Sequence, residues 1–441
     1  MPGRFALPRG MHDIYPEEME ERLWLYDKIL QVMRKYGFKL VEPTPIEALE
    51  TLEAKSGPAI RDEIYHFKDK SGRDLGLRFD LTVGMTRMVA GRSDLPEPLK
   101  ICAISGMWRY DEPQFARYRY FHQWDAEIYG SEHPLADAEI IALSMDVLDS
   151  VGLANHELLI SSRPIVEGYI ESQGVKDRNI RLEILRAIDK MRGTTQPGLV
   201  EKLRPLTLST DIVESIASFV SLRGAPDKIL NELSYLKCES PSFKSGLETL
   251  SKLIEYLGWY GKLDKCFLDM SIVRGIDYYD GIVFEAYDKG GEEVGAILGG
   301  GRYDCLGRIY GKRMLPATGV AGGIERMLIS LRREKLIPGD VSRNPKVFVA
   351  AVNEEVRGEA VALASKIRGG GIACEIDLKN RSLRRQLEYA EAIKALYTVI
   401  VGPEELSRGK VKIRDMERRE EEELTISSLE EYLKGKITER R

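Results

Sequence analysis

The 441-residue chain lacks long hydrophobic runs. No segment offers the roughly 20 consecutive apolar residues that a membrane-spanning helix requires. Residues 1–13 carry prolines and arginines where a signal peptide would have an apolar stretch. We therefore expect a cytoplasmic protein without a membrane segment.

Cysteine is scarce as well. The chain has five cysteines, and no two of them form a CxxC pair. This argues against a zinc knuckle and against a disulfide framework, so we expect reduced and mostly buried thiols. They are Cys102, Cys238, Cys266, Cys305 and Cys374.

The chain also has little net charge, −5 at pH 7. This argues against a protein that coats nucleic acid indiscriminately through a basic surface. A selective RNA partner is still possible, because it needs only a locally basic face. The apolar and charged fractions, 43% and 31%, are those of an ordinary globular protein, and the length predicts two or three domains.

The pattern along the chain predicts one α+β domain that is interrupted by helices. Residues 1–164 mix helices and strands, including an amphipathic helix over 17–36. Residues 39–46 are short and strand-like, and their prolines, which cannot donate ladder hydrogen bonds, indicate an edge strand or a strand near an interface. Residues 165–256 are leucine-rich and helical, which indicates an insertion. Strand-like and glycine-rich segments return in residues 257–335, so we expect them to complete the first domain.

The C-terminal part has a different pattern of predicted secondary structure. After a polar connector, residues 332–345, strand-like and helix-like segments alternate through residues 345–441. Alternation of this kind predicts a small, mainly parallel α/β domain. We interpret the acidic run at 418–424 as a solvated turn or helix face.

Residues 107–130 are the most informative stretch. Strands over 107–111 and 118–128, joined by a loop, would place alternate side chains on opposite faces. One face of the second strand is aromatic, which indicates packing against a core, whereas the other is polar and either faces water or lines a pocket. The polar face carries Arg119, Phe121, Gln123, Asp125 and Glu127, and the aromatic face carries Tyr118, Tyr120, His122, Trp124, Ala126 and Ile128.

Glycine-rich segments further along favour the pocket. Residues 271–287 place Arg274 and a glycine before an acidic residue and two tyrosines, and LGGGRYD follows at 298–304. Glycines let a backbone approach a ligand or a second strand closely. In residues 317–328, Arg326 falls in the first turn of a helix that we predict after two glycines.

Together these motifs resemble the histidyl-tRNA synthetase family of class II aminoacyl-tRNA synthetases, and the resemblance covers essentially the whole chain. Seven motifs occur in the order that the family shows. They are the opening motif at 9–13, motif 1 at 43–47, motif 2 at Arg109 with the hairpin, motif 3 at 323–326, the two histidine-specific signatures at 274–279 and 299–304, and the amino-acid-binding segment at 77–82.

The resemblance implies a ligase that uses ATP to activate L-histidine as an adenylate and then esterifies it onto the histidine tRNA. It implies an α+β fold with an antiparallel class II catalytic sheet, a helical insertion and a C-terminal α/β anticodon-binding domain. It also implies a homodimer with motif 1 at its interface. In the C-terminal domain, Arg381, Arg384 and Arg385 are candidate tRNA contacts, although a solvated helix face explains any one of them equally well.

The chemistry of adenylate formation agrees with these motifs. A carboxylate must approach the α-phosphate, so the site has to neutralise two mutually repelling anions, which arginine does well. By resemblance, Arg109 and Arg274 are the catalytic residues that grip the α-phosphate and the histidine carboxylate. Arg117 and Arg326 would hold the γ-phosphate, and Phe121 would sandwich the adenine against Arg326. Mg²⁺ on the β- and γ-phosphates needs no set of protein ligands.

Histidine recognition follows similar logic. Imidazole presents a donor and an acceptor at a fixed separation, so a buried carboxylate with a tyrosine hydroxyl rejects side chains that lack both. By resemblance, Glu127 supplies that carboxylate. The other histidine-binding candidates are Tyr278, Tyr279 and Tyr303 around the ring, Asp80 and Thr82 on the ammonium group, and Gln123 and Arg274 on the carboxylate.

The chain departs from the family pattern at a few positions. Asp111, an expected ATP-binding residue, stands where many class II enzymes carry Glu, and Ala116 stands where bacterial relatives often have Gly. Either Pro43 or Pro45 can be the motif 1 proline. None of the five histidines is needed as a catalyst, and we interpret His122, on the aromatic face, as structural.

Two other functions are known for proteins that resemble this family. A paralogue of the family is a regulatory subunit of ATP phosphoribosyltransferase, which binds histidine without ligating it, typically lacks the anticodon domain and has lost parts of the ATP site. This chain keeps Arg109, Arg274 and Arg326 and continues for about a hundred residues past the connector, so the ligase is favoured. A synthetase-like sensor of uncharged tRNA usually comes with a kinase, and no kinase signature occurs.

Overall fold

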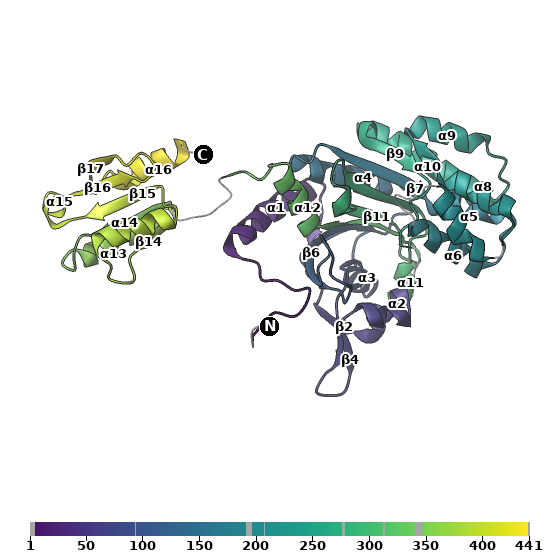
Figure 1. Ribbon diagram of the computed structural model, residues 1–441, viewed down its shortest axis with the longest axis horizontal. Coiled ribbons are helices and arrows are strands. Elements are labelled where there is room, and N and C mark those ends of the chain that lie inside the picture. Colours follow the sequence, from purple (N-terminus) through teal and green to yellow (C-terminus); the bar gives the residue numbers. More distant parts are fainter. Residues whose placement is uncertain are drawn as a thin grey trace. The chain divides into compact units, whose positions relative to one another are not determined.

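The computed structural model forms two compact units, Met1–Ile337 and Pro338–Arg441, drawn in Figure 1. Two residues of the 274–279 signature, 276 and 277, and residues 340–345 of the connector lie outside the described residues. Within the described part of the chain, no helix has the length and apolar character needed to cross a membrane. The described residues are 5–92, 94–190, 196–206, 208–275, 278–311, 314–339 and 346–439.

A nine-stranded sheet forms the centre of the first unit. Its strand order is β1-β5-β6-β12-β11-β10-β7-β9-β8, and every pairing except β1 with β5 and β7 with β9 is antiparallel. The predicted antiparallel sheet is confirmed, and segments on both sides of the helical region contribute to it. The strands are β1 (Lys39–Leu40), β5 (Leu99–Trp108), β6 (Tyr120–Tyr129), β7 (His156–Ser162), β8 (Arg223–Gly224), β9 (Cys266–Asp269), β10 (Ile282–Asp288), β11 (Leu298–Arg302) and β12 (Ala317–Gly323).

Helices α1 (Pro16–Lys35), α4 (Pro134–Ser150) and α12 (Ile324–Arg333) pack together on one face of this sheet. Leu25 of α1 and Met327 of α12 share a hydrophobic core with Trp124 of β6. Trp124, Ala126 and Ile128 therefore lie in the core, as their alternation in the sequence predicted. The opposite face of β6 packs toward a second, smaller core.

Within residues 165–256, the described part is helical, as predicted, apart from connecting turns and the two-residue strand β8. Their buried side chains, such as Ile184, Ile216 and Leu250, belong to the same hydrophobic core as the sheet. That core is therefore continuous between the helices and the sheet. The helices are α5 (Arg163–Ser172), α6 (Arg178–Asp189), α7 (Gln196–Leu203), α8 (Thr210–Val220), α9 (Pro226–Tyr235) and α10 (Pro241–Trp259).

The prediction of one strand over 39–46 was wrong in its extent, although β1 does lie at the edge of the large sheet. β1 ends at Leu40, and β2 (Ile46–Ala48) begins a separate three-stranded sheet with β4 (Asp74–Leu77) and β3 (His66–Lys68). The chain leaves the large sheet between them because its prolines, Pro43 and Pro45, have no N–H to donate to a ladder. Nearby helices are α2 (Leu49–Ser56), α3 (Thr82–Ala90) and α11 (Leu306–Tyr310).

The second unit has a five-stranded sheet of order β14-β13-β15-β16-β17. β14 (Cys374–Ile376), β13 (Val347–Ala351) and β15 (Tyr397–Val401) are parallel, but β16 (Lys410–Asp415) and β17 (Glu421–Thr425) add an antiparallel hairpin. The sheet is thus mixed, where a mainly parallel one was predicted. Its helices are α13 (Arg357–Gly369), α14 (Leu383–Ala392), α15 (Pro403–Ser407) and α16 (Leu429–Glu439).

The acidic run at 418–424 supplies most of β17, so the prediction of a turn or helix face was wrong for that part. The strand is largely exposed at the sheet edge. Glu421 pairs with Arg414 of β16 at 3.3 Å, and Glu423 pairs with Lys410 at 3.4 Å. Cross-strand pairs of opposite charge stabilise such a strand, and its charges protect the edge from pairing with another chain. The cysteines are free and, except for Cys305, buried, as predicted.

Candidate active site

A cavity of about 290 Å³ opens beside the β5–β6 hairpin, strand β11 and the start of α12. Its lining brings together residues that lie far apart in the sequence, from the hairpin to the glycine-rich segments. Seven of the predicted site residues line it: Arg109, Asp111, Arg117, Phe121, Gln123, Arg274 and Arg326.

Two of the four arginines in this cavity are paired with carboxylates. Arg117 lies 2.7 Å from Asp111 within the hairpin, and Arg274 lies 2.8 Å from Glu285 of β10. Burial alone would lower the pKa of Arg274, but Glu285 and the nearby tyrosines raise it overall. Arg274 is therefore held as a cation with one side fixed by Glu285.

The other two arginines contact backbone carbonyls. Arg109 donates to a carbonyl at 3.0 Å and lies over the ring of Phe121, 5.0 Å from its centroid. Arg326 donates to another carbonyl at 2.7 Å. Burial lowers the pKa of both, and for Arg326 the repulsion from Arg274, Arg117 and Arg109 adds to the effect. The cavity therefore holds excess positive charge, which suits a polyanionic ligand.

Two glycines make room for these charged side chains. A Cβ added to Gly299 of β11 would lie 1.8 Å from Nη1 of Arg274. A Cβ added to Gly319 of β12 would lie 1.4 Å from Oε2 of Glu127. Neither position tolerates a side chain without displacing the charged group, which explains the glycines of both segments in physical terms.

Glu127 lies at the centre of a second cluster beneath the cavity and is only 1% exposed. Its Oε1 accepts a hydrogen bond from Thr82 at 3.0 Å, and its Oε2 accepts one from the hydroxyl of Tyr303. The rings of Tyr278 and Tyr279 lie 6.1 and 6.3 Å from that of Tyr303. Burial and the charge of Glu127 raise the pKa of Tyr303, which keeps its hydroxyl protonated as a donor.

The two clusters adjoin each other. Asp80 caps α3 by accepting from the backbone N–H of Val83 at 3.0 Å, and its charge acts on Arg109. Gln123 lines the cavity, and within the described residues its buried Oε1 has no hydrogen-bond partner. Asp80, Thr82, Glu127 and the three tyrosines do not line the arginine-rich cavity; Tyr278 and Tyr279 line a neighbouring one of about 470 Å³.

The departures from the family pattern have visible places in the structure. Asp111 forms the ion pair with Arg117 described above. Ala116 has φ of +58°, in the left-handed region that favours glycine, and its carbonyl accepts a long hydrogen bond of 3.4 Å from Arg326. His122 contacts Arg22 at 3.1 Å and Tyr120 at 3.3 Å.

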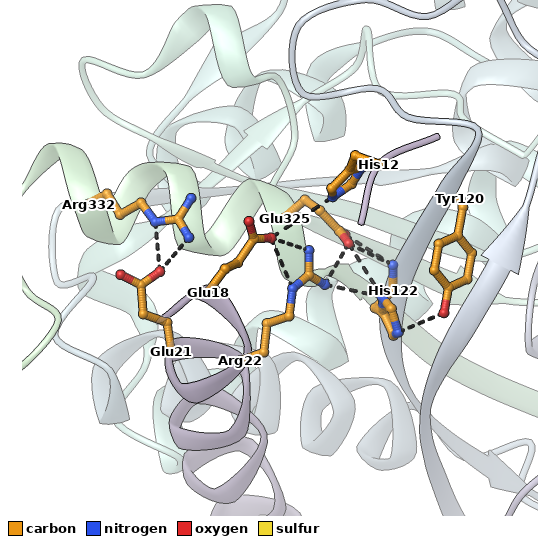
Figure 2. A network of polar contacts seen from close by, with 8 residues as sticks. All are labelled: His12, Glu18, Glu21, Arg22, Tyr120, His122, Glu325 and Arg332. Carbon is orange, nitrogen blue, oxygen red and sulfur yellow. Dashed lines mark hydrogen bonds and ion pairs between the residues drawn. The ribbon is translucent and has the colours of Figure 1, made fainter. Parts of the chain in front are cut away.

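Sequence reasoning missed three charged residues that support the site: Glu285, Arg22 and Glu325. Glu285 follows three apolar residues at the start of β10, and an acidic residue inside a mostly buried strand was a usable signal. Arg22 shares the buried face of α1 with Leu25 and Ile29, so an arginine at an apolar position was a second signal. Figure 2 shows how Arg22 meets Glu325 beside the hairpin strand.

Comparisons with known proteins agree with this arrangement. Residues 10–327 match the family model for histidyl-tRNA synthetase, and residues 346–436 match that for an anticodon-binding domain. The histidine–tRNA ligase of Pyrococcus furiosus is 36% identical over 97% of this chain and 98% of its own length. That of Pyrobaculum neutrophilum is 36% identical over 95% of this chain and 97% of its own.

Solved structures are similar over nearly the same length. Histidyl-tRNA synthetase from Nostoc sp. PCC 7120 has a TM-score of 0.84 at 25% identity and covers 98% of this chain and 99% of its own. An ATP phosphoribosyltransferase regulatory subunit/histidyl-tRNA synthetase from Bacillus halodurans C has a TM-score of 0.76 at 26% identity, over 91% of this chain and 100% of its own. With a family model that matches residues 10–327 and relatives that extend over almost its full length, the chain belongs to the histidyl-tRNA synthetase family.

Proposed function

We propose that this protein activates L-histidine with ATP and transfers it to the histidine tRNA. A carboxylate oxygen of histidine attacks the α-phosphorus, the bond to the β-phosphate oxygen breaks, and pyrophosphate leaves. A ribose hydroxyl at the 3′ end of the tRNA then attacks the carbonyl of the histidyl-adenylate and releases AMP. The carrying observation is that four arginines meet in one cavity beside the buried carboxylate of Glu127.

Arg109 and Arg274 have the environment that the first step requires. Attack on the α-phosphate brings two anions together, and fixed cations in a cavity shielded from water stabilise the charge that develops. Arg274 is held by Glu285, so its guanidinium is oriented before substrate arrives. We assign Arg109 and Arg274 to the α-phosphate and the histidine carboxylate, and Gln123 to the same carboxylate.

The rest of the cavity suits the remainder of ATP. Phe121 and Arg326 both line it, and a flat guanidinium and an aromatic ring can enclose a purine from two sides. Arg117, with Asp111 as its partner, lies in the hairpin loop and can meet the far end of the triphosphate. We assign Phe121 and Arg326 to the adenine, and Arg117 and Arg326 to the γ-phosphate.

The second cluster suits the substrate side chain. Glu127 accepts from Thr82 and Tyr303, and a carboxylate has further lone pairs for the N–H of an imidazole. Tyr278 or Tyr279 would supply the second hydrogen bond. We assign Asp80 and Thr82 to the ammonium group. A site of this kind rejects side chains that leave a buried polar group unpaired.

We propose Mg²⁺ on the β- and γ-phosphates of bound ATP. The described residues contain no group of three or more His, Cys, Asp or Glu side chains that could hold a metal ion. Mg²⁺ keeps several waters and needs few protein ligands, so phosphate oxygens and water can supply most of its coordination. When bound, it would offset charge on the leaving pyrophosphate.

We further propose a cytoplasmic homodimer with residues 43–47 at its interface and tRNA contacts in the second unit. The match of residues 346–436 to an anticodon-binding domain supports the tRNA contacts. Arg384 is 89% exposed, and Arg385 is exposed beside it. Arg381 pairs with Asp377 at 2.8 Å and lies over the ring of Tyr389, with only 22% of its side chain exposed. Arg384 also pairs, with Glu388 at 3.1 Å, but its greater exposure makes it and Arg385 the better candidates.

The test is charging of tRNA. Purified protein, ATP, labelled histidine and a histidine tRNA transcript should give acid-precipitable label, and a tRNA whose terminal ribose has been oxidised by periodate should give none. A matched transcript for another amino acid is the specificity control. Binding of histidine without charging would refute the proposal and favour the regulatory-subunit alternative.

A further inference from the structure

A buried polar network extends from the wall of the cavity toward α1 (Figure 2), and one of its members, Glu325, is part of the cavity lining. Arg22 is fully buried, and its Nη1 donates to Oε1 of Glu325 at 2.8 Å. Its Nη2 donates to Glu18 at 2.7 Å within the same helix. The backbone N–H of His122 on β6 is shared between the two carboxylate oxygens of Glu325, 3.0 Å from each. One carboxylate thus joins α1, α12 and the hairpin strand.

Residues next to this network in the sequence line the cavity. His122 directly follows Phe121, and Glu325 directly precedes Arg326. Phe121 and Arg326 both line the cavity, one from β6 and the other from α12. The hydrogen bonds between Glu325 and the backbone of His122 therefore fix the strand that carries Phe121 against the helix that carries Arg326.

A purely structural account explains this arrangement poorly. Burying an arginine and a glutamate costs about as much desolvation as their attraction returns, and well-packed apolar side chains would often serve stability as well. α1 already has Leu25, Ile29 and Met33 in the core. Without Arg22, Glu325 would be a buried carboxylate with no cation beside it, which favours protonation and loosens its hold on the strand.

The electrostatics are consistent with a carboxylate kept ionised for this purpose. Burial alone would raise the pKa of Glu325, but the hydrogen bonds to His122 and the charge of Arg22 hold it below its usual value. An ionised carboxylate can accept from Arg22 and from the backbone of His122 at the same time. If Glu325 were protonated, one of its oxygens would become an O–H donor. Both oxygens face N–H donors, so one of the present hydrogen bonds would be lost.

We propose that Arg22 is a positioning residue for ATP: it fixes Glu325 so that Phe121 and Arg326 keep the separation at which adenine fits between them. The inference rests on the proposed function, because it takes adenine as the occupant of this part of the cavity. Its consequence is selective. Loss of Arg22 should weaken the use of ATP and leave the histidine pocket around Glu127 intact.

The chain offers a matched control in the same pair of helices. Arg332 of α12 forms an ion pair with Glu21 of α1, with side chains 43% and 26% exposed (Figure 2). This pair also joins α1 to α12, but Arg332 lies nearer the other end of α12, away from the cavity lining. Its removal tests whether loss of any contact between the two helices has the same effect.

The experiment compares Arg22→Met, Arg22→Lys and Arg332→Met with the unaltered protein in histidine-dependent ATP–pyrophosphate exchange. For Arg22→Met we expect the KM for ATP to rise about tenfold or more, the scale of a lost charged hydrogen bond, with the KM for histidine within twofold. Lysine keeps the charge, but its single ammonium nitrogen lacks the separated donors with which Arg22 reaches Glu18 and Glu325. Arg22→Lys should therefore recover part of the loss. Arg332→Met should change neither constant.

A KM for ATP within twofold of normal in folded Arg22→Met, or an equal rise in both KM values, would overturn the inference. If Arg22→Met does not fold, Arg22→Lys decides by the same two criteria, with its thermal unfolding midpoint as the check on folding. Failure of the unaltered protein to exchange would instead refute the proposed function. The two failures are therefore distinguishable.

Discussion

Replacement of Glu127 by glutamine tests the assignment of the histidine pocket. Both carboxylate oxygens already accept, from Thr82 and Tyr303, and the side chain is only 1% exposed. Glutamine keeps one acceptor oxygen but turns its NH₂ group toward hydroxyl donors, and it has no charge to offer an imidazole N–H. A hydrogen bond to a charged group contributes about 1.5–3 kcal/mol, so kcat/KM for histidine should fall roughly 10- to 150-fold.

The assay is histidine-dependent ATP–pyrophosphate exchange with each substrate varied in turn. Because Glu127 does not line the arginine-rich cavity, the KM for ATP should stay within about threefold of normal. A thermal unfolding midpoint close to that of the unaltered protein would show that the buried substitution is tolerated. If folded Glu127→Gln keeps kcat/KM for histidine within threefold, Glu127 does not bind the substrate ring and the pocket is misassigned.

Three further substitutions test separate parts of the account. Arg274→Ala should slow adenylate formation by about two to three orders of magnitude, because a cation that stabilises the transition state is lost; near-normal pyrophosphate exchange would contradict this. Gly319→Ala puts a methyl group where Oε2 of Glu127 lies, so the KM for histidine should rise at least tenfold. An unchanged KM would show that the backbone of β12 can shift enough to accept the methyl group. Burial lowers the pKa of His156, so the stability it contributes is present above about pH 6.5 and lost as pH falls through its folded value. In His156→Gln, thermal unfolding midpoints measured from pH 7 to 5 should decline less steeply than in the unaltered protein. An identical decline would show that His156 does not contribute to the pH dependence of stability.

Local patterns in the sequence were enough to predict the hairpin strand. Alternation along residues 118–128 assigned Trp124, Ala126 and Ile128 correctly to the core, and Phe121 and Gln123 to the other face, where they line the cavity. This worked because one face of the strand packs into the apolar core, so a shift of one residue would place its polar set there. The alternation was wrong for Tyr118, which was placed on the core face but lines the cavity, because β6 begins only at residue 120.

Contacts between distant segments could not be predicted in the same way. Arg22 and Glu325 are 303 positions apart, and no local period relates them. The roles of Asp80 and Thr82 came from resemblance alone, since only the fold brings α3 beside β6. The acidic run at 418–424 was misread because its glutamates pair with basic residues of the neighbouring strand at the sheet edge. Composition by itself indicates only that such a run is exposed to solvent.

The measurement that tests the central claim most directly is ATP–pyrophosphate exchange without tRNA, run with histidine beside each of the other amino acids. The account predicts exchange with histidine alone, because the arginine cavity would activate only the amino acid that the Glu127 pocket accepts. No exchange from a protein that still binds histidine would contradict it. The arginines would then have to be explained without adenylate chemistry.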